Sequence, residues 1–210
     1  MIRKDIKSFA KTMPNGVLMV VATKYYDIDD LSTLLDAGIC DFGENRVDSF
    51  LPKYEYFKGQ DVHWHFIGHL QRNKAKKVLN KIDYLHSLDS LELAKMINEV
   101  REKELPTLIE VSVNEEENKN GVKIPELDAF VEELLKYPKV KLVGLMMMAI
   151  DGSDEESLHH QFAKLRETRD KLEKKFNIKL PELSMGMSHD YKIAIEEGAT
   201  MVRLGHIIGE

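Results

Sequence analysis

The decisive part of the chain is residues 17–26, which read Val17-Leu18-Met19-Val20-Val21-Ala22-Thr23-Lys24-Tyr25-Tyr26. Its first seven residues are apolar or β-branched, which is typical of a short strand buried on both faces of a parallel sheet. An open dinucleotide-binding sheet usually has Gly-x-Gly-x-x-Gly directly after such a strand. No glycine occurs in residues 17–26, so the segment favours another parallel architecture.

The same unit, a short apolar run followed by a loop and a charged amphipathic segment, repeats along the chain. The predicted strands are Val17–Thr23, Ile39–Phe42, His63–Ile67, Tyr84–Ser87, Thr107–Ser112, Lys141–Met146, Leu183–Gly186 and Met201–Leu204. The predicted helices between them are Ile28–Asp36, Arg46–Phe57, Asn73–Leu79, Leu91–Lys103, Leu127–Lys136, Glu155–Lys175 and Tyr191–Glu197. Because strands and helices alternate with no Pro/Ser-rich linker, we predict a single α/β domain over residues 1–210, a (β/α)8 TIM barrel.

The composition narrows the class of protein. Hydrophobic residues make up 43% and charged residues 31% of the 210 residues, as in ordinary globular domains. The formal net charge of −6 gives no overall attraction to nucleic acid, and no apolar run reaches the roughly 18 residues of a membrane span. The N-terminus is too polar for a signal peptide, so we expect a cytoplasmic protein. We interpret the single cysteine, Cys40, as a small buried hydrophobic residue.

Polar residues follow several of the predicted strands, where a barrel of this kind collects its functional groups. Lys24 follows strand one, and an amine at the end of an apolar strand has to reach the barrel mouth, because burying it unpaired costs several kcal/mol. A desolvated lysine is suited to Schiff-base chemistry. The alternative, a lysine that only extends to the rim, stays open. The other candidates are Glu44, Asn45, Gly68, His69, Gln71, Met187, Ser188, Arg203, Gly205 and His206.

The loops after the last two strands predict an anion site. Ser188 is a natural helix N-cap, and the free amides of that first helical turn would face an anion. Gly205 allows a backbone amide to approach a phosphate oxygen closely, and TIM barrels frequently bind phosphate with these two loops. A helix cap and a turn without any ligand remain the alternative.

Several ordered blocks resemble one family. They are Lys24 after its apolar strand, Asp41-Phe42-Gly43-Glu44-Asn45-Arg46-Val47, His65 to Lys74, Leu183 to Tyr191, and Gly198 to Gly205. From about residue 17 to 209 the chain resembles the pyridoxal-phosphate homeostasis proteins, whose fold is that of the alanine racemase N-terminal domain.

The resemblance implies a pyridoxal 5'-phosphate (PLP) site with the cofactor held as a Schiff base on Lys24. It implies phosphate contacts from Ser188, Arg203, Gly205 and His206, with Asn45, Gly68 and His69 near the ring. Arg203 is also expected to face the pyridine nitrogen. The chain departs from the family at His206, where a small hydroxyl residue is usual, so this phosphate contact is expected from the backbone only. Thr23-Lys24-Tyr25 replaces the familiar Ser-Lys-Thr, which puts the ring-side neighbours in doubt.

The resemblance also bears on activity. Alanine racemases take a second base from a C-terminal β-domain and a partner subunit, and this chain ends after strand eight. We therefore predict a non-catalytic, monomeric PLP carrier that buffers the cofactor and passes it to PLP-dependent apoenzymes. No catalytic residue and no metal ligand is assigned. Residues 2–13, an amphipathic helical pattern, are expected to cover the flank that lacks an eighth helix.

Three alternatives stay open. The first is a racemase-type PLP enzyme of weak activity. The second is a metal-dependent hydrolase, because His63-x-His65 places two imidazoles on one face of strand three. The third is an interaction module that regulates PLP enzymes by contact, using the basic run after Gln71.

Overall fold

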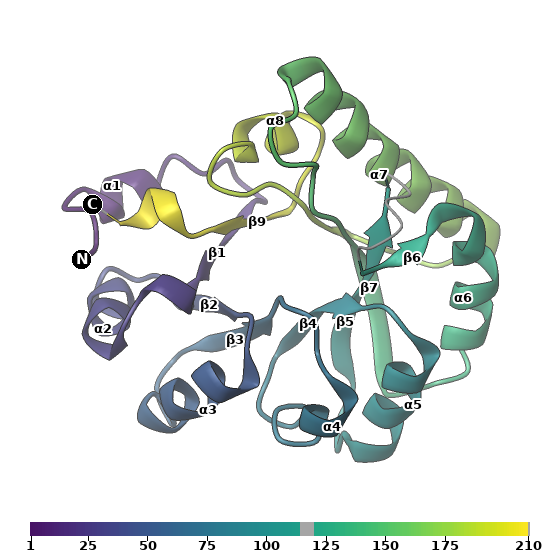
Figure 1. The fold of residues 1–210 in the computed structure, drawn as a ribbon, viewed down its shortest axis with the longest axis horizontal. Helices are drawn as coiled ribbons and strands as arrows, with labels where there is room; N and C mark the ends of the chain where they lie inside the picture. The colour runs from purple at the N-terminus through teal and green to yellow at the C-terminus, as the bar shows by residue number, and fades with distance from the viewer. Residues whose placement is uncertain (114–119, 210) are drawn as a thin grey trace.

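A closed ring of parallel strands forms the centre of the molecule, with helices around the outside (Figure 1). The computed structural model describes residues 1–113 and 120–209. The strands of the ring are β1 (Leu18–Ala22), β2 (Asp41–Glu44), β3 (His63–Phe66), β4 (Tyr84–Leu88), β5 (Leu105–Ser112), β7 (Val140–Met146), β8 (Glu182–Ser184) and β9 (Met201–Leu204). Each pairs in parallel with the next, and β9 pairs with β1 to close the ring. The predicted (β/α)8 barrel is confirmed.

Most of the predicted strands differ from the observed ones by one or two residues at an end, and one strand and one strand start differ for a clear reason. A short strand, β6 (Val122–Lys123), pairs with the end of β5 outside the ring, and two residues are too few to carry a sequence pattern. Strand β2 begins at Asp41 rather than Ile39. The reason is that the Ile39 amide donates to the Leu34 carbonyl at 3.0 Å, so Ile39 still belongs to the turn that ends the preceding helix. Glu44 therefore lies in the strand and not in the loop after it.

The helices lie on the outer side of the barrel (Figure 1). They are α2 (Ile28–Asp36), α3 (Val47–Tyr56), α4 (Arg72–Ala75), α5 (Leu91–Val100), α6 (Leu127–Leu134), α7 (Glu155–Phe176) and α8 (Tyr191–Glu196). Short 3₁₀ turns lie at η1 (Thr23–Tyr25), η2 (Ile124–Glu126) and η3 (His206–Ile208). The prediction of a helix over residues 73–79 is wrong beyond Ala75, where turns follow. In the described ranges, no helix is long and apolar enough to cross a membrane.

The N-terminal segment covers the flank beside β9, as expected. Ile2 forms an antiparallel bridge with Gly209, and the Arg3 amide donates to the Ile208 carbonyl at 3.0 Å. Helix α1 (Ile6–Ala10) follows, and its Phe9 ring meets the Tyr191 ring of α8 edge-on at 6.4 Å. The two ends of the chain consequently lie side by side (Figure 1).

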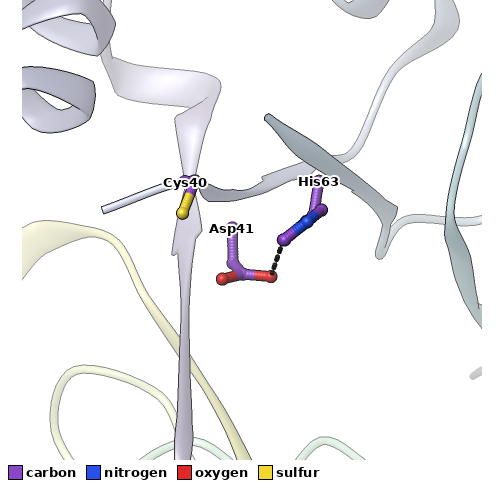
Figure 2. A group of neighbouring side chains, drawn as sticks. All are labelled: Cys40, Asp41 and His63. Carbon is purple, nitrogen blue, oxygen red and sulfur yellow. Dashed lines mark hydrogen bonds and ion pairs between the residues drawn. The ribbon is translucent and has the colours of Figure 1, made fainter. Parts of the chain in front are cut away.

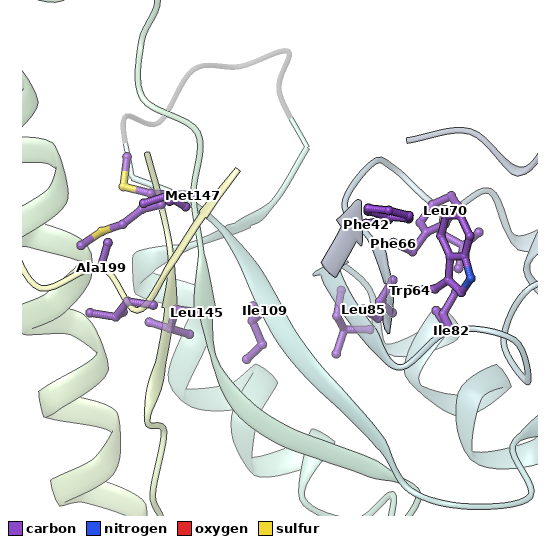
Figure 3. Packing of buried hydrophobic residues seen from close by; sticks show 14 of the residues in the cluster. Phe42, Trp64, Phe66, Leu70, Ile82, Leu85, Ile109, Leu145, Met147 and Ala199 are labelled. Atoms are coloured by element: carbon purple, nitrogen blue, oxygen red, sulfur yellow. The ribbon is translucent and has the colours of Figure 1, made fainter. Parts of the chain in front are cut away.

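The apolar core lies between the strands and the surrounding helices. On the side of β2 and β3, Trp64 packs edge-on against Phe42 at 5.7 Å and against Phe50 of α3 at 5.3 Å between ring centroids. Figure 3 shows Phe42, Trp64 and Phe66 gathered there. The inside of the barrel, in contrast, holds buried polar groups, among them His65, His86, Ser184 and Arg203. Hydrogen bonds link these four side chains to one another, and Arg203 also lines the cavity of the candidate site.

Candidate functional site

A cavity of about 360 Å³ opens at the carboxyl ends of β1, β2 and β9, within the usual range of about 300–1,000 Å³ for small-molecule sites. Six predicted site residues line it: Lys24, Asn45, Ser188, Arg203, Gly205 and His206. Gly68 and His69 do not; they line a neighbouring cavity of about 500 Å³, which shares Asn45 with the first. The amine and the predicted anion loops are thus in one cavity, and the Gly68-His69 corner lies beside it.

Lys24 lies at the mouth of this cavity. It occupies η1, a turn closed by the Tyr26 amide, which donates to the Thr23 carbonyl at 3.1 Å. Its side chain is exposed, and Nζ lies 4.5 Å from the centroid of the Tyr25 ring. Within the described part of the chain, no carboxylate forms an ion pair with Nζ. The amine is therefore available to a ligand.

A buried carboxylate holds the two loops that carry Lys24 and Asn45. Glu44 is fully buried and accepts hydrogen bonds from the Thr23 hydroxyl at 2.9 Å and the Asn45 amide at 2.8 Å. Lys53 of α3 donates to Glu44 Oε2 at 2.8 Å and to the Thr23 carbonyl at 2.7 Å. Sequence reasoning noted Glu44 only as a residue at a strand end. Its role depends on Lys53, nine residues away, whose pairing no motif indicates.

The loops after β8 and β9 meet at the Ser188 hydroxyl. The amides of Gly205 and Ile207 both donate to Ser188 Oγ, at 3.2 and 3.3 Å. The predicted N-cap role of Ser188 is wrong, because α8 begins only at Tyr191. A tight turn intervenes, in which Asp190 Oδ1 accepts from the Met187 amide at 2.5 Å. The amides that meet Ser188 therefore belong to the loop after β9 and not to the first turn of α8.

The backbone of Gly205 is held by Tyr26, whose buried hydroxyl donates to the Gly205 carbonyl at 2.7 Å. Its φ of −120° lies outside the left-handed region that favours glycine. An added Cβ would meet no atom closer than 3.4 Å, the Tyr25 ring. Neither a positive φ nor a close contact with a described residue requires glycine at 205, and the missing Cβ leaves room for a ligand to approach the backbone. The exposed His206 ring packs against Tyr25 with 4.4 Å between centroids.

Gly68, unlike Gly205, is required by the fold. A Cβ at this position would lie 2.4 Å from the Asn45 carbonyl oxygen, a distance that no side chain tolerates. The glycine thus allows the loops after β2 and β3 to touch. His69 Nδ1 pairs with Asp89 at 3.0 Å, which directs this imidazole toward the loop after β4.

Asn45 offers an acceptor that the protein does not satisfy. Its Oδ1 is buried and lacks a hydrogen-bond partner among the described residues. An unsatisfied buried polar atom costs about 1–3 kcal/mol. A ligand in the shared cavity that donates to this oxygen would recover that free energy.

Arg203 lies on the inner wall, buried to 5% exposure. Its guanidinium donates to Ser184 Oγ at 2.7 Å and to the Met147 carbonyl at 2.8 Å. Burial lowers the pKa of Arg203 to about 10, while Glu110 and Asp190 act in the opposite direction. The side chain is therefore charged at neutral pH.

A chain of hydrogen bonds continues from Arg203 through the barrel to its other end. Ser184 Oγ lies 2.8 Å from His86 Nδ1, His86 Nε2 lies 2.9 Å from His65 Nδ1, and His65 Nε2 lies 3.1 Å from Asp41 Oδ1. Burial, then His65 and Arg203, hold the pKa of His86 well below its usual value. Because the Arg203 guanidinium only donates and the Asp41 carboxylate accepts, the hydrogen bonds of this chain all fit one direction, from Arg203 toward Asp41. Sequence reasoning missed this chain, because its members come from separate strands.

Glu110 predicts a pH dependence of stability. Burial, then Asp89, raises its pKa to about 7, with Arg203 and His69 opposing, from an ordinary value of 4.5. Because the folded-state pKa is the higher one, the protein loses stability as pH rises from about 4.5 to about 7. Glu110→Gln removes this loss, so its stability relative to wild type should rise by about 3 kcal/mol between pH 4.5 and pH 8. Urea unfolding of both proteins across this range measures it, and a pH-independent difference would contradict it.

Comparisons with known proteins agree with this geometry. The family model described as the alanine racemase N-terminal domain matches residues 1–208. The pyridoxal phosphate homeostasis protein of Aquifex aeolicus is 43% identical over 197 residues, covering 92% of this chain and 86% of that protein. The corresponding protein of Escherichia coli K12 is 34% identical over 203 residues, covering 93% and 86%.

Solved structures of related proteins have the same fold as this chain. PipY of Synechococcus elongatus, solved without PLP, superposes with a TM-score of 0.94 at 30% identity, covering 100% of both chains. The same protein with PLP bound gives 0.91 at 28% identity, covering 98% of this chain and 100% of that one. An alanine racemase of Clostridium difficile matches at 0.80 and 16% identity, with 57% of its length covered, which shows a shared fold.

Proposed function

Because the chain belongs to the alanine racemase N-terminal domain family and, within it, to the pyridoxal phosphate homeostasis proteins, we propose that it holds and releases PLP. The observation that carries this proposal is the placement of Lys24 in one cavity with Ser188 and Gly205. A ligand that carries both an aldehyde and a phosphate would use both ends of this cavity.

The residues fit this cofactor at three points. The Lys24 amine is exposed at the cavity mouth. The Gly205 and Ile207 amides converge on Ser188 Oγ, so rotation of the Ser188 side chain would leave two amides and a hydroxyl close enough together to bind a phosphate. The buried Asn45 Oδ1 is an acceptor whose partner is absent from the described residues.

When bound, PLP supplies an aldehyde that reacts with a primary amine and a phosphate that accepts hydrogen bonds. Lys24 provides the amine, and Ser188, Gly205 and the η3 turn provide the phosphate donors. Tyr26 donates to the Gly205 carbonyl, and Glu44 accepts from the hydroxyl of Thr23, which precedes Lys24, and from the amide of Asn45. We assign Arg203 to the ring, because its guanidinium points toward Ser184 and Met147 and not toward Ser188. Gly68 and His69 line the adjacent cavity and would lie behind Asn45 on the side of the PLP ring.

The proposed role is that of a carrier without catalytic turnover, acting as a monomer in the cytoplasm and passing PLP to apoenzymes. Arg203 stays charged at neutral pH, and a guanidinium discourages protonation of a pyridine nitrogen. The cofactor is then a weaker electron sink. The nearest phenol, Tyr25, is 49% exposed and packed against His206, which leaves water access to the lysine.

The test uses the protein loaded with PLP and supplied with L-alanine and other amino acids. We expect an absorbance band for protein-bound PLP, and D-amino acid formation no faster than with free PLP alone, measured by chiral chromatography. Addition of an apoenzyme that requires PLP should restore that enzyme's activity and deplete the band. Racemisation that exceeds free PLP and disappears in Lys24→Ala would establish the enzyme alternative instead.

A further inference from the structure

Three potential metal ligands meet at the amino-terminal end of the barrel, opposite the cavity that contains Lys24. Cys40 directly precedes β2, Asp41 is the first residue of β2, and His63 is the first residue of β3. Their ligand atoms all lie within 4.8 Å of one another. Figure 2 shows the Asp41 carboxylate lying between the Cys40 thiol and the His63 imidazole. We propose that these three residues bind a divalent cation of the zinc class.

The backbone holds the three residues in place. Asp41 and His63 are direct register partners in the parallel pairing of β2 with β3. The His63 amide donates to the Cys40 carbonyl at 2.8 Å, which ties Cys40 to the same pair of strands. The ligands therefore lie on two neighbouring strands of a closed barrel, so ordering them for a cation requires little additional loss of backbone entropy.

The Asp41 carboxylate is oriented from inside the barrel. His65, whose side chain is fully buried, donates to Asp41 Oδ1 at 3.1 Å. Its other nitrogen faces His86 at 2.9 Å. Hydrogen bonds of this kind orient the ligands of metal sites. His65 itself has both nitrogens engaged, so it positions a ligand and does not serve as one.

The location differs from that of the hydrolase alternative considered above. His63 and His65 do project to one face, since both contact Asp41 Oδ1. That face lies at the end of the barrel away from the cavity, and one of the two imidazoles is committed to the interior chain. The proposed site therefore uses Cys40, Asp41 and His63 as ligands, and not the pair of histidines in the sequence motif.

The chemistry of the three groups selects the cation. Thiolate, imidazole and carboxylate are the ligands that Zn²⁺ prefers, and a sulfur ligand disfavours Mg²⁺ and Ca²⁺, which take oxygen. The nearby Asp61, with Oδ1 at 4.0 Å from His63 Nε2, adds negative charge. The His63 side chain is 52% exposed, so water has access to a fourth position.

Binding of a cation requires the ligand atoms of Cys40, Asp41 and His63 to move slightly closer together. Zinc bonds of about 2.0–2.3 Å bring ligand atoms to within about 4 Å of one another, somewhat closer than the present group. Rotation of the Cys40 and His63 side chains, neither of which is buried, supplies this movement. The His63 to Asp41 hydrogen bond of 3.2 Å is replaced by bonds from each residue to the cation.

The test is equilibrium dialysis of the full-length, reduced, chelator-treated protein against micromolar Zn²⁺ without PLP, with bound metal measured by atomic spectroscopy. We expect one equivalent per chain, unaffected by excess Mg²⁺. Cys40→Ala and His63→Ala should each weaken binding by at least about tenfold. His160→Ala, which removes an exposed imidazole of α7, is the matched control and should bind as wild type does.

Cobalt supplies an independent measurement. Co²⁺ bound to a thiolate gives a sulfur-to-metal absorbance band, expected in wild type and absent in Cys40→Ala. Circular dichroism checks that each variant is folded. Less than half an equivalent of zinc in the wild type, or equal affinity of wild type, Cys40→Ala and His63→Ala, would overturn the site.

Discussion

Lys24→Ala is expected to abolish covalent attachment of PLP while leaving the protein folded. Wild type mixed with PLP should develop the absorbance of a lysine-bound cofactor, and borohydride should fix one PLP per chain in the mass spectrum. The variant should show neither, because among the described lysines only Lys24 lines the cavity with Ser188 and Gly205. Lys24 is exposed and lacks an ion pair in the described ranges, so its removal should change the free energy of unfolding by about 0.5 kcal/mol or less.

Lys76→Ala is the matched control, since Lys76 is also exposed and is not among the residues that line the cavity. It should keep the full absorbance and the full mass shift. Retention of one borohydride-fixed PLP by Lys24→Ala, on another lysine, would refute the assignment of the amine. A loss of binding shared by both variants would point to nonspecific reaction of surface lysines.

Glu44→Ala is expected to produce the largest loss of stability, about 3–5 kcal/mol, as is typical when one partner of a buried ion pair is removed. The variant leaves Lys53, whose side chain is 12% exposed, without its carboxylate. It also removes the acceptor of the Thr23 hydroxyl and the Asn45 amide. Urea unfolding measures the loss. PLP attachment should weaken as well, because the loops carrying Lys24 and Asn45 lose their common anchor.

Two further variants separate charge from packing at this position. Glu44→Gln retains an acceptor oxygen and should lose less stability than Glu44→Ala. The double variant Glu44→Gln with Lys53→Met removes both charges and should be more stable than Lys53→Met alone, in which the buried carboxylate lacks its cation. A urea midpoint for Glu44→Ala equal to that of wild type would show that the pair does not hold these loops.

The barrel itself was predictable from local patterns. Several strands contain a short apolar run. Helices such as residues 28–36, where prediction and structure agree, have an apolar stripe with period 3.6. Errors arose where local signals were weak or ambiguous. Ile39 looks like the start of a strand but closes a helix, and Ser188 looks like a helix cap but accepts from the loop after β9. For Ile39 the deciding partner is Leu34 of the preceding helix, and for Ser188 the partners lie in the loop after the following strand.

The sequence by itself determined which residues stand at the carboxyl ends of the strands, because the period of the apolar pattern places strand ends within one or two residues. Lys24, Asn45 and Gly205 followed from that alone. Only the tertiary structure decided which of these groups share a cavity, that Glu44 pairs with Lys53, and that Cys40 meets His63. Such pairings depend on closure of the ring and on side-chain direction. These bring residues far apart in the chain within a few ångströms, and no local pattern records them.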